Sequence, residues 1–159
     1  MTVPGSPHRA WVEVDHDAIR ANLEVIRRSA PGAHVIGVVK ANAYGHGAVS
    51  VARTLVAAGV ERLAIATVDE AIELREAGVD IPLVVLWGIG PDEASIVTRH
   101  ALEPIVYDER AIELLEAAGD REGVRIGVHL KVDTGLGRQG ADPDDAVALA
   151  SRVTRSRHL

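Results

Sequence analysis

The chain has 159 residues, enough for one ordinary domain, and its 47% hydrophobic and 25% charged residues are typical of a folded globular protein rather than a disordered one. A formal net charge of -6 excludes a general nucleic-acid binder, because such a protein needs clustered positive charge to contact phosphates. The absence of cysteine excludes disulfides and thiolate ligands, and no histidine pair has the spacing of a helical zinc site, so no metal is expected. The longest apolar stretch, residues 81–89, is too short to cross a membrane, and the N-terminus lacks an apolar signal segment, which together predict a cytoplasmic protein.

Residues 1–10 contain two prolines and one glycine and are expected to form a loose lead-in, with the folded domain at residues 11–159. Apolar spacing along this domain predicts strands that alternate with helices. The predicted strands are residues 11–15, 35–39, 63–66, 82–87, 103–106 and 124–132. The predicted helices are residues 16–29, 48–58, 68–77, 91–99, 108–118 and 143–155. The β-branched run at residues 35–39 is expected to be buried on both faces, and Asp142 to be the N-cap of the last helix.

This alternation predicts an α/β fold, in which a parallel sheet is covered by helices. Two architectures fit the pattern, a doubly wound open sheet and a (β/α)8 TIM barrel. No Gly-x-Gly-x-x-Gly motif follows an early strand, which disfavours the dinucleotide-binding form of the open sheet. Because a complete barrel takes about 250 residues, the chain is expected to form a partial barrel that lacks the later strands.

Lys40 directly follows the apolar strand predicted at residues 35–39, within the segment Val-Val-Lys-Ala-Asn-Ala-Tyr-Gly-His-Gly at residues 38–47. In parallel α/β folds, ligands bind at the carboxyl ends of the strands. A lysine desolvated at such a place is a good nucleophile toward a carbonyl and can form a Schiff base with an aldehyde cofactor. Tyr44, on the same loop, can donate a hydroxyl hydrogen bond to a ligand. The alternative is a solvated lysine beside a tyrosine that packs in the loop.

A second candidate segment, residues 129–140, is a predicted strand that leads into a glycine-rich turn carrying Arg138. The planar fork of arginine makes directed, charge-assisted bonds to a carboxylate or a phenolate-like oxygen. Lys131 and Asp133 alternate along the predicted strand and so point to the same side, where each charge needs a partner. The alternative is an ordinary turn with a solvated arginine.

Other residues near these segments are expected to have structural roles. Trp87 ends a predicted strand and is expected to pack in the core rather than to line a pocket. The acids on the predicted helix at residues 68–77 are expected to form a solvated face; they are Asp69, Glu70, Glu73 and Glu76.

The segment Val-Lys-Ala-Asn-Ala-Tyr-Gly-His-Gly resembles the cofactor-lysine signature of alanine racemases, and residues 129–140 resemble a later strand of the same family. The resemblance implies that Lys40 holds pyridoxal phosphate as a Schiff base and moves the α-proton on one face of the amino acid. It implies that Tyr44 binds the cofactor phosphate, and that Arg138 binds the cofactor ring oxygen close to the substrate. Lys131 matches a lysine that many members carry as a carbamate, which would brace Arg138. An unmodified Lys131 paired with Asp133 would give the same sequence.

The implied reaction interconverts L- and D-alanine, supplying D-alanine for peptidoglycan, in a homodimer. Racemisation needs one acid/base group on each face of the carbanion that forms at the α-carbon of the amino acid. Lys40 would be one of these groups, and in this family the other is a tyrosine in a C-terminal β-domain of the partner subunit. No segment matches it, and the context of Tyr107 does not resemble it. The chain is therefore expected to be the N-terminal part of the cofactor-binding barrel, without the later strands and the β-domain, and inactive alone.

Three alternatives remain at this point. One is a non-catalytic barrel protein that binds pyridoxal phosphate. Another is a racemase for a different amino acid, such as serine. The third is a structural fragment that binds nothing.

Overall fold

Five parallel strands form the sheet of this protein. The computed structural model describes residues 11–159, so the lead-in predicted at residues 1–10 lies outside the described residues. The strands are β1 (Ile36–Val38), β2 (Arg62–Ile65), β3 (Leu83–Val85), β4 (Leu102–Val106) and β5 (His129–Leu130). Their order in the sheet, β1-β2-β3-β4-β5, is their order in the chain. A doubly wound sheet reverses its strand order, so this sequential order is that of part of a (β/α) barrel wall.

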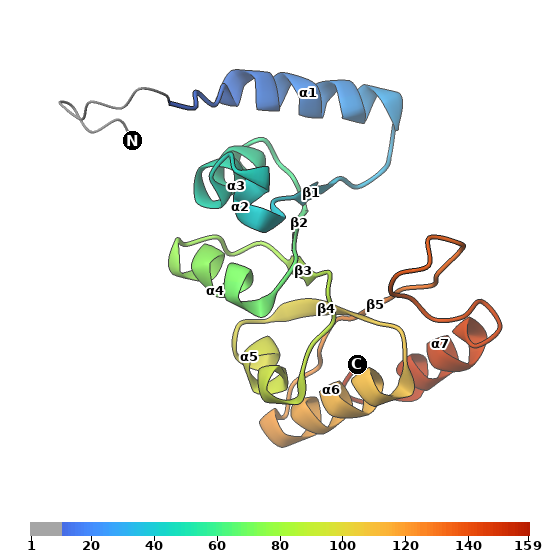
Figure 1. Cartoon of the computed structure of the whole chain (residues 1–159). Coiled ribbons are helices and arrows are strands. Elements are labelled where there is room, and N and C mark those ends of the chain that lie inside the picture. Colours follow the sequence, from blue (N-terminus) through green and yellow to red (C-terminus); the bar gives the residue numbers. More distant parts are fainter. Residues whose placement is uncertain (1–10) are drawn as a thin grey trace.

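Helices connect the strands and cover the outer side of the curved row that they form (Figure 1). The helical elements are α1 (His16–Ser29), α2 (Lys40–Tyr44), α3 (Ala48–Ala57), α4 (Val68–Glu76), α5 (Ala94–Arg99), α6 (Glu109–Glu122) and α7 (Ala146–Arg155), with a short 3-10 turn, η1 (Pro91–Glu93), before α5. The helix predicted at residues 16–29 is confirmed at both ends. Within residues 11–159, no helix has the length and hydropathy that a membrane span requires.

The main core lies between the sheet and these helices. The strand register aligns Leu63 with Leu83, and Leu83 with Leu102, in one row on the outer face. These side chains are fully or almost fully buried, and Ala71 and Leu74 of α4 belong to the same core cluster. A smaller inner cluster consists of Ala64, Val84 and Ile105. The alternation of side chains along each strand thus separates a packed outer face from an inner face that surrounds the barrel axis.

The inner face of β1 is open, so the expectation that residues 35–39 are buried on both faces is wrong. Ile36 and Val38 are 43% and 42% exposed. The outer face is tightly packed, since a Cβ added at Gly37 would lie 2.8 Å from Leu55 Cδ1. β1 is the edge strand of this sheet, and no further strand among the described residues brings side chains over its inner face.

Three other predictions are corrected. Residues 11–15 form no strand, because no described segment pairs with them, and Trp11 is 71% exposed. The strand predicted at residues 124–132 is reduced to the two residues of β5 that pair with β4. The last helix begins at Ala146 rather than residue 143, because Asp142 accepts a bond from the Asp144 N–H at 3.0 Å and so forms a turn before the helix.

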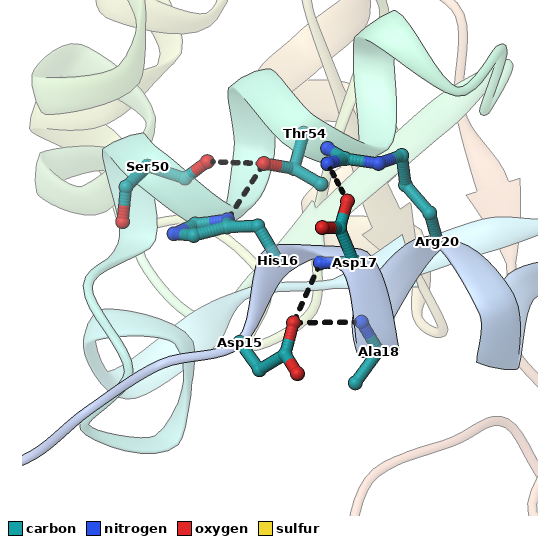
Figure 2. A network of polar contacts seen from close by, with 7 residues as sticks. All are labelled: Asp15, His16, Asp17, Ala18, Arg20, Ser50 and Thr54. Atoms are coloured by element: carbon teal, nitrogen blue, oxygen red, sulfur yellow. Dashed lines mark hydrogen bonds and ion pairs between the residues drawn. The ribbon is translucent and has the colours of Figure 1, made fainter.

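Helix α1 is fixed against α3 by a polar network (Figure 2). Asp15 caps α1, since its Oδ1 accepts bonds from the N–H groups of Asp17 and Ala18 at 2.9 and 3.0 Å. His16 Nδ1 lies 2.7 Å from Thr54 Oγ1, which donates its single proton to the Ser50 carbonyl oxygen at 3.1 Å. The contact between His16 Nδ1 and Thr54 Oγ1 joins the start of α1 to the middle of α3.

Three polar side chains, Arg62, Glu103 and His129, meet on the inner face, far from the carboxyl ends of the strands. Glu103 Oε2 accepts bonds from Arg62 Nε at 3.0 Å and from His129 Nε2 at 2.9 Å. Partial burial raises the pKa of Glu103, but the hydrogen bonds from His129 and Arg62 outweigh it and leave that pKa below the ordinary value of 4.5. The cluster therefore links β2, β4 and β5 through one carboxylate.

A Glu103→Gln variant is expected to be less stable than the wild type by about 2 kcal/mol at neutral pH, because Arg62 and His129 lose a charged acceptor. The folded pKa of Glu103 is depressed, so this contribution is complete above the unfolded pKa and is lost as pH falls through the folded pKa. Urea unfolding between about pH 6 and pH 3 checks this expectation. The stability difference between wild type and variant should shrink toward the acid end, and a constant difference would contradict it.

Candidate active site

A cavity of about 570 Å³ lies at the carboxyl ends of the strands. It is lined by Lys40, Leu86, Trp87, Lys131, Arg138 and Gln139. Three of these residues are cations and none is an acid, so the lining favours an anionic ligand. A second cavity, of about 440 Å³, lies at the opposite end of the sheet near Arg75 and Glu103. Since parallel α/β folds bind ligands at the carboxyl ends of their strands, the first cavity is the candidate site.

Both lysines of the chain line this cavity. Lys40 and Lys131 are the only lysines in the sequence, against fifteen arginines, and they follow β1 and β5 respectively. Lys40 is half-buried directly after Val39, which is 1% exposed. The sheet therefore brings together the two segments on which the sequence prediction rests, although 90 residues separate them.

Lys40 is the first residue of α2, and the residues that follow it form a left-handed turn rather than an ordinary α-helix. Ala41, Asn42, Ala43 and Tyr44 have φ values of 51°, 54°, 51° and 55°. The left-handed conformation costs roughly 1–2 kcal/mol per residue for most side chains and less for asparagine, so the two alanines and the tyrosine together cost about 3–6 kcal/mol. Strain of this size persists only where surrounding contacts hold it, and such strain is concentrated at functional sites.

Hydrogen bonds hold this turn at both ends. The Ala43 N–H donates to the Val39 carbonyl oxygen at 2.8 Å. Asn42 Oδ1 accepts from the Ala48 N–H at 2.7 Å, and the Asn42 carbonyl oxygen accepts from the Gly47 N–H at 2.9 Å. The turn is thereby fixed to the end of β1 and to the start of α3.

Glu70 of α4 also contacts this turn, so the expectation that it belongs to a solvated face is wrong. Glu70 Oε1 accepts from the Ala41 N–H at 2.7 Å, and Oε2 accepts from the Ala66 N–H at 2.7 Å. Sequence reasoning missed this residue because both of its partners are backbone groups, which no side-chain pattern marks.

Asp133 organises the turn that carries Arg138. Its Oδ1 accepts from the N–H groups of Gly135 and Gly137 at 2.9 and 3.1 Å, and its Oδ2 accepts from the Arg138 N–H at 3.1 Å. These backbone bonds, with that of Gly135 the strongest, hold the pKa of Asp133 below its usual range. A Cβ added at Gly140 would lie 2.5 Å from the Asp133 nitrogen, so only glycine lets the two ends of the turn approach so closely.

Of the other residues considered in the sequence, Lys131 and Trp87 line the cavity, whereas Tyr44 and Asp133 do not. No ion pair joins Lys131 to Asp133 anywhere in the described part of the chain, since the carboxylate is occupied by the turn. Trp87 lines the cavity and is 61% exposed, so the expectation that it packs in the core is wrong. Its carbonyl oxygen accepts from Gln139 Nε2 at 3.1 Å. Tyr44 is 60% exposed and is not among the lining residues.

Sequential parallel strands with helices between them, and lysine and arginine side chains at the strand ends, define a barrel-type α/β domain with its ligand site at the carboxyl ends of the strands. The sequence matches the family described as "Alanine racemase, N-terminal domain" over residues 14–159. The chain belongs to this family, and its five strands form part of the barrel domain of that family.

Individual relatives agree with this assignment. The chain is 40% identical to "Alanine racemase" of Methylacidiphilum infernorum over 98% of its own length, and 43% identical to "Alanine racemase" of Geobacillus stearothermophilus over 96%. It covers 40% of each of those proteins. Among solved structures, it is similar to "Alanine Racemase from Streptomyces coelicolor A3(2)", with a TM-score of 0.83, 37% identity, and coverage of 92% of this chain and 40% of that one. It is also similar to "Histidine Racemase from Leuconostoc mesenteroides subsp. sake", with a TM-score of 0.85, 32% identity, and coverage of 97% and 42%.

Proposed function

We propose that this chain is the N-terminal part, residues 11–159, of the pyridoxal-phosphate-binding barrel of an alanine racemase, and that Lys40 binds the cofactor. The observation that supports this proposal most is the presence of Lys40 at a strand end, in a cavity that it shares with Lys131 and Arg138. The lining fits the cofactor, because it offers one amine for the aldehyde and additional positive charge for an anion. A cavity of about 570 Å³ also lies within the usual range for cofactor sites.

The residues of this chain would divide the chemistry as follows. Pyridoxal phosphate, when bound, supplies an electron sink that stabilises negative charge at the α-carbon of the amino acid. Lys40 would hold the cofactor through its Nζ amine and, as a free amine, would remove or return the α-proton on one face of the amino acid. Arg138 would bind the cofactor ring oxygen beside the substrate, and Tyr44 would donate its hydroxyl proton to the phosphate. Lys131, as a carbamate, would brace the Arg138 guanidinium.

The whole protein is proposed to interconvert L- and D-alanine in the cytoplasm as a homodimer and so to supply D-alanine for peptidoglycan. This chain spans about 40% of the length of the relatives that it matches, so the proposal concerns the whole polypeptide that carries it. Chiral analysis of alanine after incubation with that polypeptide and pyridoxal phosphate tests the proposal. Absence of conversion would contradict it.

A racemase for another amino acid is the second candidate. It is favoured by the similarity in fold to the histidine racemase, whose TM-score of 0.85 compares with 0.83 for the alanine racemase of Streptomyces coelicolor, although its sequence identity is lower, at 32% against 37%. Including serine and histidine beside alanine in the same assay separates the two candidates, because the preferred substrate should have the highest kcat/KM.

A further inference from the structure

Glu70 joins the Lys40 turn to the end of the neighbouring strand. Its two carboxylate oxygens accept from the N–H groups of Ala41, the residue directly after Lys40, and Ala66, the residue directly after β2. Both distances are 2.7 Å, which is at the short end for bonds between an amide and a carboxylate. One side chain therefore fixes the backbone at the ends of two adjacent strands, on the side of the sheet where the candidate site lies.

The position of Glu70 is itself fixed by a buried helix. Its own N–H group donates to Thr67 Oγ1, the N-cap of α4, at 3.4 Å. Val68 and Leu74 of the same helix are 1% and 0% exposed within the main core. A carboxylate in the first turn of a helix also interacts favourably with the positive end of the helix dipole. The core thus holds the carboxylate at a set place, and the carboxylate holds the turn.

Glu70 fixes the residue of the left-handed turn that directly follows Lys40, by accepting from the Ala41 N–H. The other bonds described above hold Asn42 and Ala43 to β1 and α3, whereas the Ala41 N–H is held by Glu70. Ala41 has a φ of 51°, a conformation that alanine rarely adopts without support. Loss of the Glu70 carboxylate would let this residue relax, and the backbone of Lys40 would move with it.

We propose that Glu70 is a positioning residue for Lys40: by accepting from the Ala41 N–H, it holds the backbone from which the lysine side chain enters the cavity. The inference rests on the proposed role of Lys40 in binding pyridoxal phosphate. It assigns no contact between Glu70 and the cofactor or substrate. Glu70 acts through the peptide unit between Lys40 and Ala41. Its effect is on the rate and the affinity with which Lys40 captures the aldehyde.

A Glu70→Gln variant tests this inference, with Asp69→Asn as the matched control. Glutamine has one acceptor oxygen in place of two and no charge, so one of the two amides loses its partner and the other keeps only a weaker, neutral acceptor; the bond from the Ala41 N–H is weakened in either case. Asp69 lies in the same first turn, is exposed, and makes no side-chain hydrogen bond or ion pair with any residue from 11 to 159, so its variant removes the same charge without touching the turn. The variants are made in the whole polypeptide as expressed.

Two measurements are made on each variant. Amide hydrogen exchange without cofactor should be about tenfold or more faster at Ala41 in Glu70→Gln, and unchanged at the core amide of Leu83. Covalent capture of pyridoxal phosphate, followed by its visible absorbance, should be slower by about tenfold or more in Glu70→Gln. Asp69→Asn should match the wild type in both measurements.

Some results would overturn the proposed role of Glu70. Capture at the wild-type rate in Glu70→Gln overturns the inference, as does faster exchange at Ala41 and Leu83 alike, which is the mark of general destabilisation. If Glu70→Gln does not fold, Glu70→Asp decides: it keeps the charge but is one methylene too short to reach both amides, so slower capture supports the inference and the wild-type rate overturns it. A wild type that captures no pyridoxal phosphate overturns the proposed function, while exchange at Ala41 still reports whether Glu70 holds the turn.

Discussion

Replacing Lys40 with alanine is expected to abolish the covalent capture of pyridoxal phosphate and the visible absorbance that accompanies it. Lys40 is one of two amines at the candidate site and is the one that directly follows a fully buried residue, Val39. Alanine removes the nucleophile and leaves the cavity otherwise intact, so the loss should be complete rather than partial. The measurement is an absorbance titration with pyridoxal phosphate, in the wild type and the variant.

Two control variants separate the chemistry from the charge. Lys40→Arg keeps a positive charge at the strand end but has no free amine, and it should also fail to capture the aldehyde. Lys131→Ala keeps Lys40, and it should still show the covalent absorbance, at a higher concentration of pyridoxal phosphate. If the absorbance survives in Lys40→Ala and disappears in Lys131→Ala, the cofactor is bound by Lys131, and the proposed role of Lys40 is wrong.

The 159-residue chain alone is expected to bind pyridoxal phosphate but not to racemise alanine. Racemisation moves a proton on each face of the α-carbon, and Lys40 serves only one face. Of the two tyrosines, Tyr44 is 60% exposed outside the cavity lining, and Tyr107 packs against Gly88 and the inner cluster. One missing acid/base group costs about 100-fold to 10,000-fold, so turnover should be below about 1% of that of a full-length relative.

The assay that checks this compares the 159-residue chain with the alanine racemase of Geobacillus stearothermophilus under the same conditions. Enantiomer formation is followed from L-alanine and from D-alanine, after cofactor binding has been verified by absorbance. Turnover by the short chain comparable to that of the relative would show that its own residues supply both proton-transfer groups. The proposed division of roles would then be wrong.

The sequence predicted the helices better than the strand ends, for a local reason. The amphipathic spacing of α1 is carried by its own residues, and both of its ends were predicted correctly. A strand ends where its partner ends, which is a property of residues far away in sequence. For that reason β5 has two residues where residues 124–132 were predicted, and residues 11–15 form no strand without a partner.

The candidate site was predicted in part. Lys40 and Arg138 stand in long, characteristic segments, and the sheet brings them to one cavity. The left-handed turn after Lys40 was not predicted, because alanine and tyrosine do not favour a positive φ and the single Asn42 between them does not mark a run of four such residues. Glu70 was assigned to a solvated face, because helical spacing cannot reveal backbone amides that another loop presents.

The most direct test of the proposed role of Lys40 is to identify the lysine that carries the cofactor. The protein is loaded with pyridoxal phosphate, the link is reduced with borohydride, and the digested peptides are analysed by mass spectrometry. The chain has only two lysines, so the result has few possible forms. The pyridoxyl group is expected on Lys40, and no pyridoxyl group is expected on Lys131. A pyridoxyl group on Lys131, or on neither lysine, would contradict this expectation.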